Sequence, residues 1–158
     1  MTRMKPTQNH IFRYITFRLA QTLMGVDILD IREILPCKKV TRVHRAPGFV
    51  MGLANLRGQI LTVLDIGVLL GLETPGRDSG SHIIVFKHTR VGFAVDQIGD
   101  VFSTGRERIE PVPANISPGI QKYSDTVINL PEGAMILLKA GTILACVRTE
   151  AGSLREGL

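Results

Sequence analysis

The stretch 53–72 constrains the fold of this chain more than any other segment, because it combines three local signals in a fixed order. A compact corner at 55–58 (NLRG) precedes the apolar run 60–64, and a short apolar run bounded by glycine is typical of a fully buried strand. Asp65 follows at an N-cap position, and the apolar residues between it and Gly71 predict a short helix. The stretch therefore predicts a turn, a core strand and a helix.

This stretch has a counterpart near the C-terminus. The pair Asn-Leu at 55–56 recurs at 129–130, and the apolar run 60–64 recurs at 134–138. A second pair of similar segments, 25–34 and 92–101, lies upstream of the first pair at nearly the same offset. Two pairs in the same order indicate an internal repeat rather than chance similarity between apolar strands. The chain is therefore expected to contain two structurally similar halves.

The composition favours strands over long helices. Of the 158 residues, 44% are hydrophobic and 21% are charged, and the apolar residues are mostly Val, Ile and Leu in short runs. Turn signals recur about every 8–12 residues, a spacing typical of all-β barrels and sandwiches. We expect strands at 11–19, 24–28, 31–35, 40–43, 60–64, 82–86, 91–95, 98–102, 123–129 and 134–138.

The remaining segments predict connections and ends. Proline near the start of 46–52 predicts a single helical turn, the proline-rich segment 106–117 predicts an irregular loop, and 140–147 predicts a short C-terminal helix. Segment 73–81, rich in Gly, Pro and Ser, predicts a linker between a first half of about 11–72 and a second half of about 82–148 in one domain. Residues 1–10 are expected to form a disordered leader and 149–158 a frayed tail.

The net charge of +5 owes much to one basic cluster in the segment 38–45. Such a cluster is found in nucleic-acid-binding proteins, on membrane-binding surfaces and in solvated loops. Because aromatic side chains that could stack on bases are missing nearby, apart from Phe49, a solvated or protein-binding loop is favoured over nucleic acid. The two cysteines, Cys37 and Cys146, lack CxxC spacing and are expected to be free thiols.

A search for catalytic chemistry is negative. The sequence contains none of the GxSxG, P-loop, GxGxxG and HExxH motifs, and the four histidines have spacings that form no metal site. No catalytic residue, cofactor or metal site is therefore predicted. Arg57 has no acidic neighbour in sequence, so it either pairs with a distant carboxylate or faces a partner. Glu33 is expected to be a solvent-facing strand carboxylate that can pair with Arg57, unless it contacts a partner.

An ordered set of motifs carries a family resemblance. The set comprises GVDIL at 25–29, REI at 32–34, Ala46-Pro47, Phe49, Gly52, NLRG at 55–58, VLD at 63–65, VG at 91–92, VD at 95–96 and DV at 100–101. It resembles the CheW-like family, the scaffold proteins that couple chemoreceptors to the histidine kinase CheA. The resemblance covers roughly residues 12 to 148, and NLRG followed by an aliphatic strand and an aspartate is its most specific part.

This resemblance implies a fold, two partners and a set of contact residues. The fold is two small five-stranded β-barrel subdomains, and no catalytic activity is implied. One partner is the regulatory domain of CheA, bound by edge and corner residues of the first barrel. The other is the cytoplasmic hairpin tip of a chemoreceptor, bound in an apolar groove between the barrels. The partner-binding residues carried over by motif are Ile31, Glu33, Ile34, Gly52, Asn55, Leu56, Arg57 and Gly58.

The same resemblance implies a cytoplasmic protein that is held at the inner face of the membrane through receptor arrays, without insertion and without nucleic acid. Two features depart from the family pattern: the basic segment 38–45, and Pro36-Cys37 where many members carry glycine. Both lie beside the expected contact face. They leave two alternatives, a scaffold of a non-flagellar pathway such as surface motility, and a small-barrel nucleic-acid-binding module that uses the basic cluster.

Overall fold

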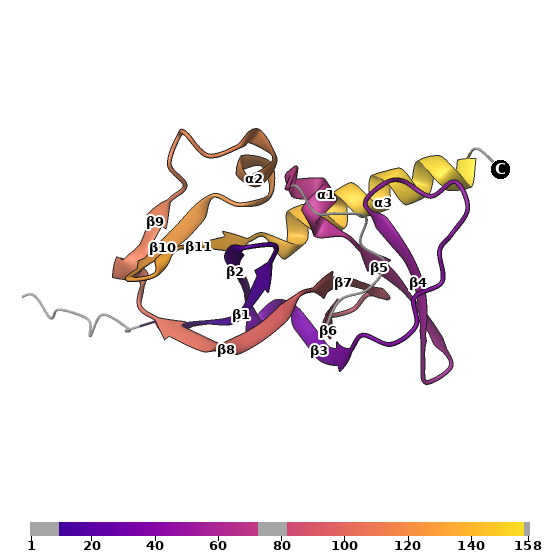
Figure 1. Ribbon diagram of the computed structural model, residues 1–158, viewed down its shortest axis with the longest axis horizontal. Helices are drawn as coiled ribbons and strands as arrows, with labels where there is room; N and C mark the ends of the chain where they lie inside the picture. Colours follow the sequence, from indigo (N-terminus) through magenta and orange to yellow (C-terminus); the bar gives the residue numbers. More distant parts are fainter. Residues whose placement is uncertain (1–9, 73–81, 157–158) are drawn as a thin grey trace, which may run out of the picture.

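The computed structural model describes residues 10–72 and 82–156, which form two β-sheets with α-helices packed beside them (Figure 1). Sheet A has the strand order β8-β1-β2-β11-β10-β9, and sheet B has the order β3-β6-β7-β5-β4. The all-β class is thereby confirmed. The strands are β1 Phe12–Leu19, β2 Thr22–Asp27, β3 Ile31–Pro36, β4 Val50–Leu56, β5 Gln59–Leu64, β6 His82–Phe86, β7 Val91–Val95, β8 Gln97–Thr104, β9 Ile109–Pro111, β10 Thr126–Leu130 and β11 Gly133–Leu138.

Each sheet is built from both halves of the sequence. Strands β1 and β2 lie in sheet A although β3, β4 and β5 lie in sheet B, and β6 and β7 lie in sheet B although β8 to β11 lie in sheet A. One pair in each sheet is parallel, β2 with β11 and β7 with β5. The order β8-β1-β2-β11-β10 therefore repeats the order β3-β6-β7-β5-β4. The internal repeat is present as two halves that exchange their first hairpins, so the sheets do not coincide with segments 11–72 and 82–148.

The expected pair of five-stranded barrels is wrong in two respects. Sheet A has six strands, because β9 adds to the edge of β10, and within the described residues neither ladder closes on itself. Sheet B comes nearest to closure, since the loop after β3 returns to the free edge of β4. There the Thr41 N–H donates to the Leu53 carbonyl and the Leu53 N–H to the Thr41 carbonyl, both at 2.7 Å.

Several connections also differ from the expectations. The segment 40–43 forms only that isolated bridge rather than a strand. No helical turn forms over 46–52, where one hydrogen-bonded turn, Pro47 to Val50, leads directly into β4. The segment 106–117 contains the 3-10 turn η2 (Arg106–Arg108) and strand β9, whose proline is tolerated because β9 lies at a sheet edge.

The helices agree in part with the expectations. Helix α1 (Ile66–Leu70) is confirmed, with the Asp65 side chain accepting from the Gly67 N–H at 3.0 Å and Gly71 in the left-handed conformation at the C-cap. Helix α2 (Pro118–Tyr123) replaces the start of the strand expected at 123–129, and it begins at a proline, which suits the first helical turn. Helix α3 (Ala140–Glu156) continues beyond residue 147, through most of the segment 149–158 that was expected to fray.

The main core lies between the sheets and under the helices. Its aromatic centre is Phe93, which contacts Phe17 from sheet A and Phe86 from sheet B, each at a ring-centroid distance of 5.3 Å. The apolar run 60–64 is buried only from Leu61 onward, and Ile60 is 55% exposed. Among the described residues, no helix is long and apolar enough to cross a membrane. The expected linker 73–81, and the expected leader except His10, lie outside the described residues.

Candidate functional site

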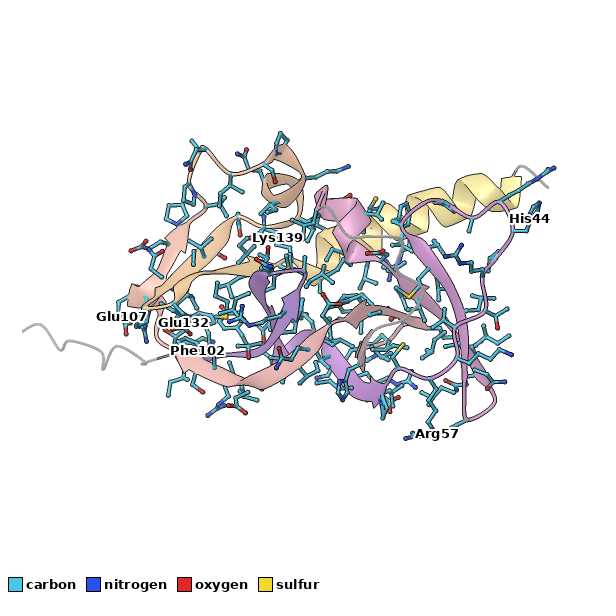
Figure 2. All side chains as sticks on the ribbon, viewed as in Figure 1. His44, Arg57, Phe102, Glu107, Glu132 and Lys139 are labelled. Atoms are coloured by element: carbon cyan, nitrogen blue, oxygen red, sulfur yellow. The ribbon has the colours of Figure 1, made fainter. Side chains whose placement is uncertain are left out.

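The corner at 55–58 forms a tight turn between β4 and β5 that projects from the molecule (Figure 2). Arg57 and Gly58 both have positive φ angles, 51° and 80°, which is the backbone pattern of a primed hairpin turn. The Asn55 side chain stabilises the turn by accepting a hydrogen bond from the Gly58 N–H at 3.1 Å. A left-handed conformation is costly for a side chain such as arginine. The turn geometry and the Asn55 hydrogen bond therefore hold the Arg57 backbone in one conformation, and this sets the direction in which its side chain leaves the turn.

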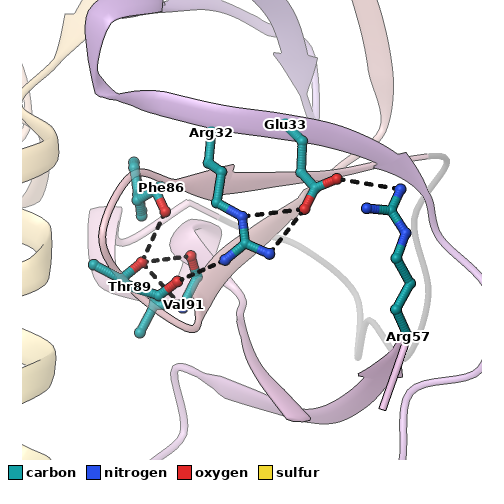
Figure 3. Close-up of polar contacts among 6 residues, drawn as sticks. All are labelled: Arg32, Glu33, Arg57, Phe86, Thr89 and Val91. Carbon is teal, nitrogen blue, oxygen red and sulfur yellow. Dashed lines mark hydrogen bonds and ion pairs between the residues drawn. The ribbon is translucent and has the colours of Figure 1, made fainter. Parts of the chain in front are cut away.

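Arg57 forms an ion pair with Glu33, with 3.6 Å between Nη2 and Oε2 (Figure 3). The Arg57 side chain is 75% exposed and that of Glu33 is 20% exposed, so the pair lies at the surface rather than in the interior. An exposed pair of this kind contributes little to stability, typically about 0.2–1 kcal/mol. Glu33 is therefore a surface-lying strand carboxylate that pairs with Arg57.

The Glu33 carboxylate is also bound by its neighbour Arg32. Its other oxygen, Oε1, lies 3.0 Å from Arg32 Nη2 and accepts from Arg32 Nε at 3.2 Å (Figure 3). Arg32 in turn donates to the Thr89 carbonyl in the β6–β7 turn at 3.4 Å. This network, Arg32–Glu33–Arg57, links β3, one edge of sheet B, to the turn that begins at β4, the other edge. No sequence signal pointed to the part played by Thr89, since a backbone carbonyl carries none.

The other predicted contact residues divide into exposed and supporting positions. Asn55 and Gly58 are exposed beside Arg57. Ile31 and Ile34 are half-buried against the main core, and Leu56 is half-buried against the core of sheet B.

Gly52 is buried and does not lie at the surface. Its φ angle is 154°, and a Cβ atom there would lie 2.3 Å from the Thr41 carbonyl oxygen. Gly52 therefore permits the close approach of the loop that follows β3. Glycine is required at this position of the motif set because any side chain would collide with the Thr41 backbone.

Several large apolar side chains are exposed near this network and in the 3-10 turn η1 (Ile28–Asp30). Ile60, which the sequence pattern placed in the core, pairs with Asn55 across the β4–β5 ladder and is exposed next to the corner. Leu29 is 68% exposed in η1, where the chain passes from sheet A to sheet B. Leu29 and Ile11 line a hollow of about 190 Å³. Within η1, burial and the nearby charge of Asp27 raise the pKa of Asp30, which Lys87 partly offsets.

The two halves of the sequence exchange hairpins and form a two-sheet β-domain, with the ion-paired corner at one edge of sheet B. Comparison with known proteins gives the family. The model of the CheW-like domain matches residues 13–146, so the chain belongs to the CheW-like family, and the resemblance inferred from the motifs is confirmed.

Individual relatives agree with this assignment. The chain is 31% identical to the chemotaxis protein CheW of Klebsiella aerogenes over 134 residues, which are 84% of this chain and 81% of that protein. It is 26% identical to protein PilI of Pseudomonas aeruginosa, over 67% of this chain and 63% of PilI. The crystal structure of the scaffolding protein TtCheW from Thermoanaerobacter tengcongensis superimposes with a TM-score of 0.71 at 27% identity, covering 82% of this chain and 90% of that one.

Proposed function

We propose that this protein is a non-enzymatic adaptor that couples chemoreceptors to the histidine kinase CheA. The observation that carries the proposal is the Arg32–Glu33–Arg57 network, because it lies at an exposed edge of sheet B in a chain of the CheW-like family. Relatives named as chemotaxis proteins support the pathway, and the structural relative TtCheW is a scaffolding protein. In this role the protein works by contact, and its place is the cytoplasmic side of receptor arrays.

The kinase contact is assigned to the corner and the adjoining strand β3. Arg57 and Gly58 in their fixed turn offer a guanidinium to a carboxylate of the regulatory domain of CheA. Since the ion pair with Glu33 is exposed and weak, a partner can take over Arg57 at little cost. Ile60 supplies an apolar contact beside it. The remaining predicted residues, Ile31, Ile34, Gly52, Asn55 and Leu56, hold this face in shape.

The receptor contact is assigned to the apolar surface where the chain crosses between the sheets. Leu29 is highly exposed there, and the hollow it shares with Ile11 is open to a partner. An amphipathic helical tip is suited to such a surface, because it binds through spaced apolar side chains. The two contacts are assigned to adjoining segments, since η1 leads directly into β3, and each uses its own side chains.

The proposal is tested by pull-down and titration calorimetry with two purified partners, the regulatory domain of CheA and a chemoreceptor hairpin fragment. Arg57→Glu is expected to weaken binding of the kinase domain by about tenfold or more, because it replaces the guanidinium with a carboxylate that repels both Glu33 and the carboxylate of the kinase domain. Binding of the receptor fragment should stay unchanged. Leu29→Asp should weaken binding of the receptor fragment and leave binding of the kinase domain unchanged.

Arg106→Glu serves as the matched control, since it makes the same charge change at another exposed arginine, in η2 and outside both assigned contacts. It should leave both affinities unchanged. Equal binding of the kinase domain by Arg57→Glu and the unaltered chain would refute the assigned role of Arg57. Failure of the unaltered chain to bind either partner would refute the adaptor function itself.

A further inference from the structure

A second apolar site lies away from the Arg32–Glu33–Arg57 network, between the β3–β4 loop and helix α3. It is a cavity of about 330 Å³, open on one side, which we term the loop pocket. Its walls include Val43, Ala46, Pro47 and Phe49 from the loop and Val147 from α3. A volume of this size lies at the lower end of the range for ligand pockets, so it accommodates one or two apolar side chains rather than a large ligand.

The loop that forms this pocket is held at three points without a helix or strand. Thr41 bridges to Leu53, the Ala46 N–H donates to the Val43 carbonyl at 3.4 Å, and the Val50 N–H donates to the Pro47 carbonyl at 2.9 Å. A wall fixed in this way loses little conformational freedom when a partner binds. The loop pocket is therefore formed before any ligand arrives.

The rim of the loop pocket is basic. Arg148 lines it directly, and the loop residues next to its walls include Arg42, His44 and Arg45. Figure 2 shows His44 on this loop near the C-terminal part of α3. Among the residues that the structure describes, no carboxylate forms an ion pair with Arg42, Arg45 or Arg148. Apolar walls thus adjoin one lining arginine and a basic stretch of loop, and the adaptor function leaves this basic segment unexplained.

We infer that the loop pocket binds an acidic peptide segment of a partner protein through one or two bulky apolar side chains of that segment. The apolar walls bind the anchor side chain, and the arginines bind the flanking carboxylates and orient the segment. A peptide fits better than a membrane surface, because the apolar atoms line a hollow rather than a projecting face. This site is separate from the contacts proposed for the kinase and the receptor.

The experiment uses the full chain, labelled with ¹⁵N, and a short synthetic peptide with a central Leu-Phe pair between runs of Glu. Two control peptides carry Ala-Ala at the centre or Lys in place of Glu. The first peptide is expected to bind and to shift the amide signals of Val43, Ala46 and Val147, whereas each control peptide should bind at least about tenfold more weakly. Binding should weaken as salt is raised.

Two substitutions test the walls and the rim. Val43→Asp, at an exposed position, should weaken binding of the first peptide by about tenfold or more. Its matched control is Val101→Asp, which alters another exposed valine, on β8. Arg148→Glu should weaken binding and flatten its salt dependence, while Arg13→Glu should do neither. Circular dichroism of each variant shows whether it remains folded.

Other occupants give distinct results, and each would overturn the inference. Equal binding of the Leu-Phe and Ala-Ala peptides, or of Val43→Asp and the unaltered chain, would show that the loop pocket is not the anchor site. Binding only to phosphatidylserine vesicles, lost in Val43→Asp, would identify a lipid surface. A concentration-dependent dimer abolished by the same substitution would identify a second copy, and peptide binding only after removal of the residues beyond Arg148 would identify the chain's own end.

Discussion

At the residue scale, Gly52 and Arg57 show that two members of one motif set act in different ways. Arg57 adopts a left-handed backbone at the surface, where its side chain can meet a partner. Gly52 adopts a positive φ angle in the interior, where the absence of a side chain admits the Thr41 backbone. The motif resemblance could place both at the contact face, since a sequence pattern does not distinguish a residue that touches a partner from one that supports it.

Gly52→Ala is therefore expected to be strongly destabilising. The added Cβ would lie 2.3 Å from the Thr41 carbonyl oxygen and 2.8 Å from its carbon, so the loop or β4 must shift. We expect the free energy of unfolding, measured by urea denaturation, to fall by about 2 kcal/mol or more. Gly141→Ala is the control, because its Cβ would meet nothing within 4 Å in helix α3 and should be neutral or slightly stabilising. Equal stability of the Gly52→Ala chain would contradict the close-approach role.

Tyr123 gives a prediction for alkaline pH. Burial, and then the hydrogen bond that its hydroxyl donates to the Cys146 thiol at 3.3 Å, raise the pKa of Tyr123 to about 12. The folded chain keeps this proton while the unfolded chain loses it near the ordinary value of 10. Between these two pH values the free energy of unfolding should therefore fall, by at most about 1.4 kcal/mol per pH unit from this group.

The measurement is urea unfolding at a series of pH values from neutral to strongly alkaline. Tyr123→Phe removes the titrating group and keeps the ring, so its unfolding free energy should fall less steeply above pH 10 than that of the unaltered chain. All other titratable groups, Tyr14 included, are common to the two chains, so the comparison cancels their contributions. Parallel curves for the two chains would show that Tyr123 ionises alike in the folded and unfolded states.

At the element scale, the short helix α1 shows which features a sequence can specify. Asp65 as N-cap and Gly71 as C-cap lie within the segment they terminate, so local pattern was enough to predict both. Strand β9 and the non-helical loop before β4 could not be predicted in the same way. Their conformations depend on partners far along the chain, β10 for β9 and the Thr41–Leu53 bridge with the β5 ladder for the loop.

Removal of the N-cap should be measurable. Asp65 is buried, and its side chain satisfies the Gly67 N–H at the start of α1. Asp65→Ala is expected to lower the free energy of unfolding by about 1–2 kcal/mol. Asp125→Ala provides the comparison, since Asp125 is 61% exposed and pairs with Lys139 at the surface, where a loss of less than about 1 kcal/mol is expected. The capping role would be disproved if chemical denaturation showed that the two variants lost the same free energy of unfolding.

At the scale of the whole molecule, the sequence indicated two similar halves but not how they combine. The similarity between 25–34 and 92–101 is the same whether each half folds by itself or exchanges a hairpin with the other. Only the long-range pairing of β1 with β8 and of β2 with β11 distinguishes these cases. The corner at 55–58 was predictable because it is local, whereas the pairing of Arg57 with Glu33 remained an alternative until the edges of sheet B were brought together.

The exchange of hairpins predicts that neither half folds alone. A fragment of residues 1–72 would contain β1 and β2 without β8 and β11, and a fragment of 82–158 would contain β6 and β7 without β3 and β5. Circular dichroism and NMR should show each fragment to be largely unfolded, because each leaves one hairpin and several edge strands unpaired. Mixing the two during refolding should restore native-like spectra. A well-dispersed spectrum from residues 1–72 alone would contradict this topology.

The crossings of the backbone between sheets A and B have a mechanical consequence. Because the polypeptide passes from one sheet to the other after β2 and again after β7, covalent bonds as well as side-chain packing tie the sheets together. Any two proteins bound to different sheets would therefore be held in an orientation that the backbone itself fixes, and not only the packing of side chains.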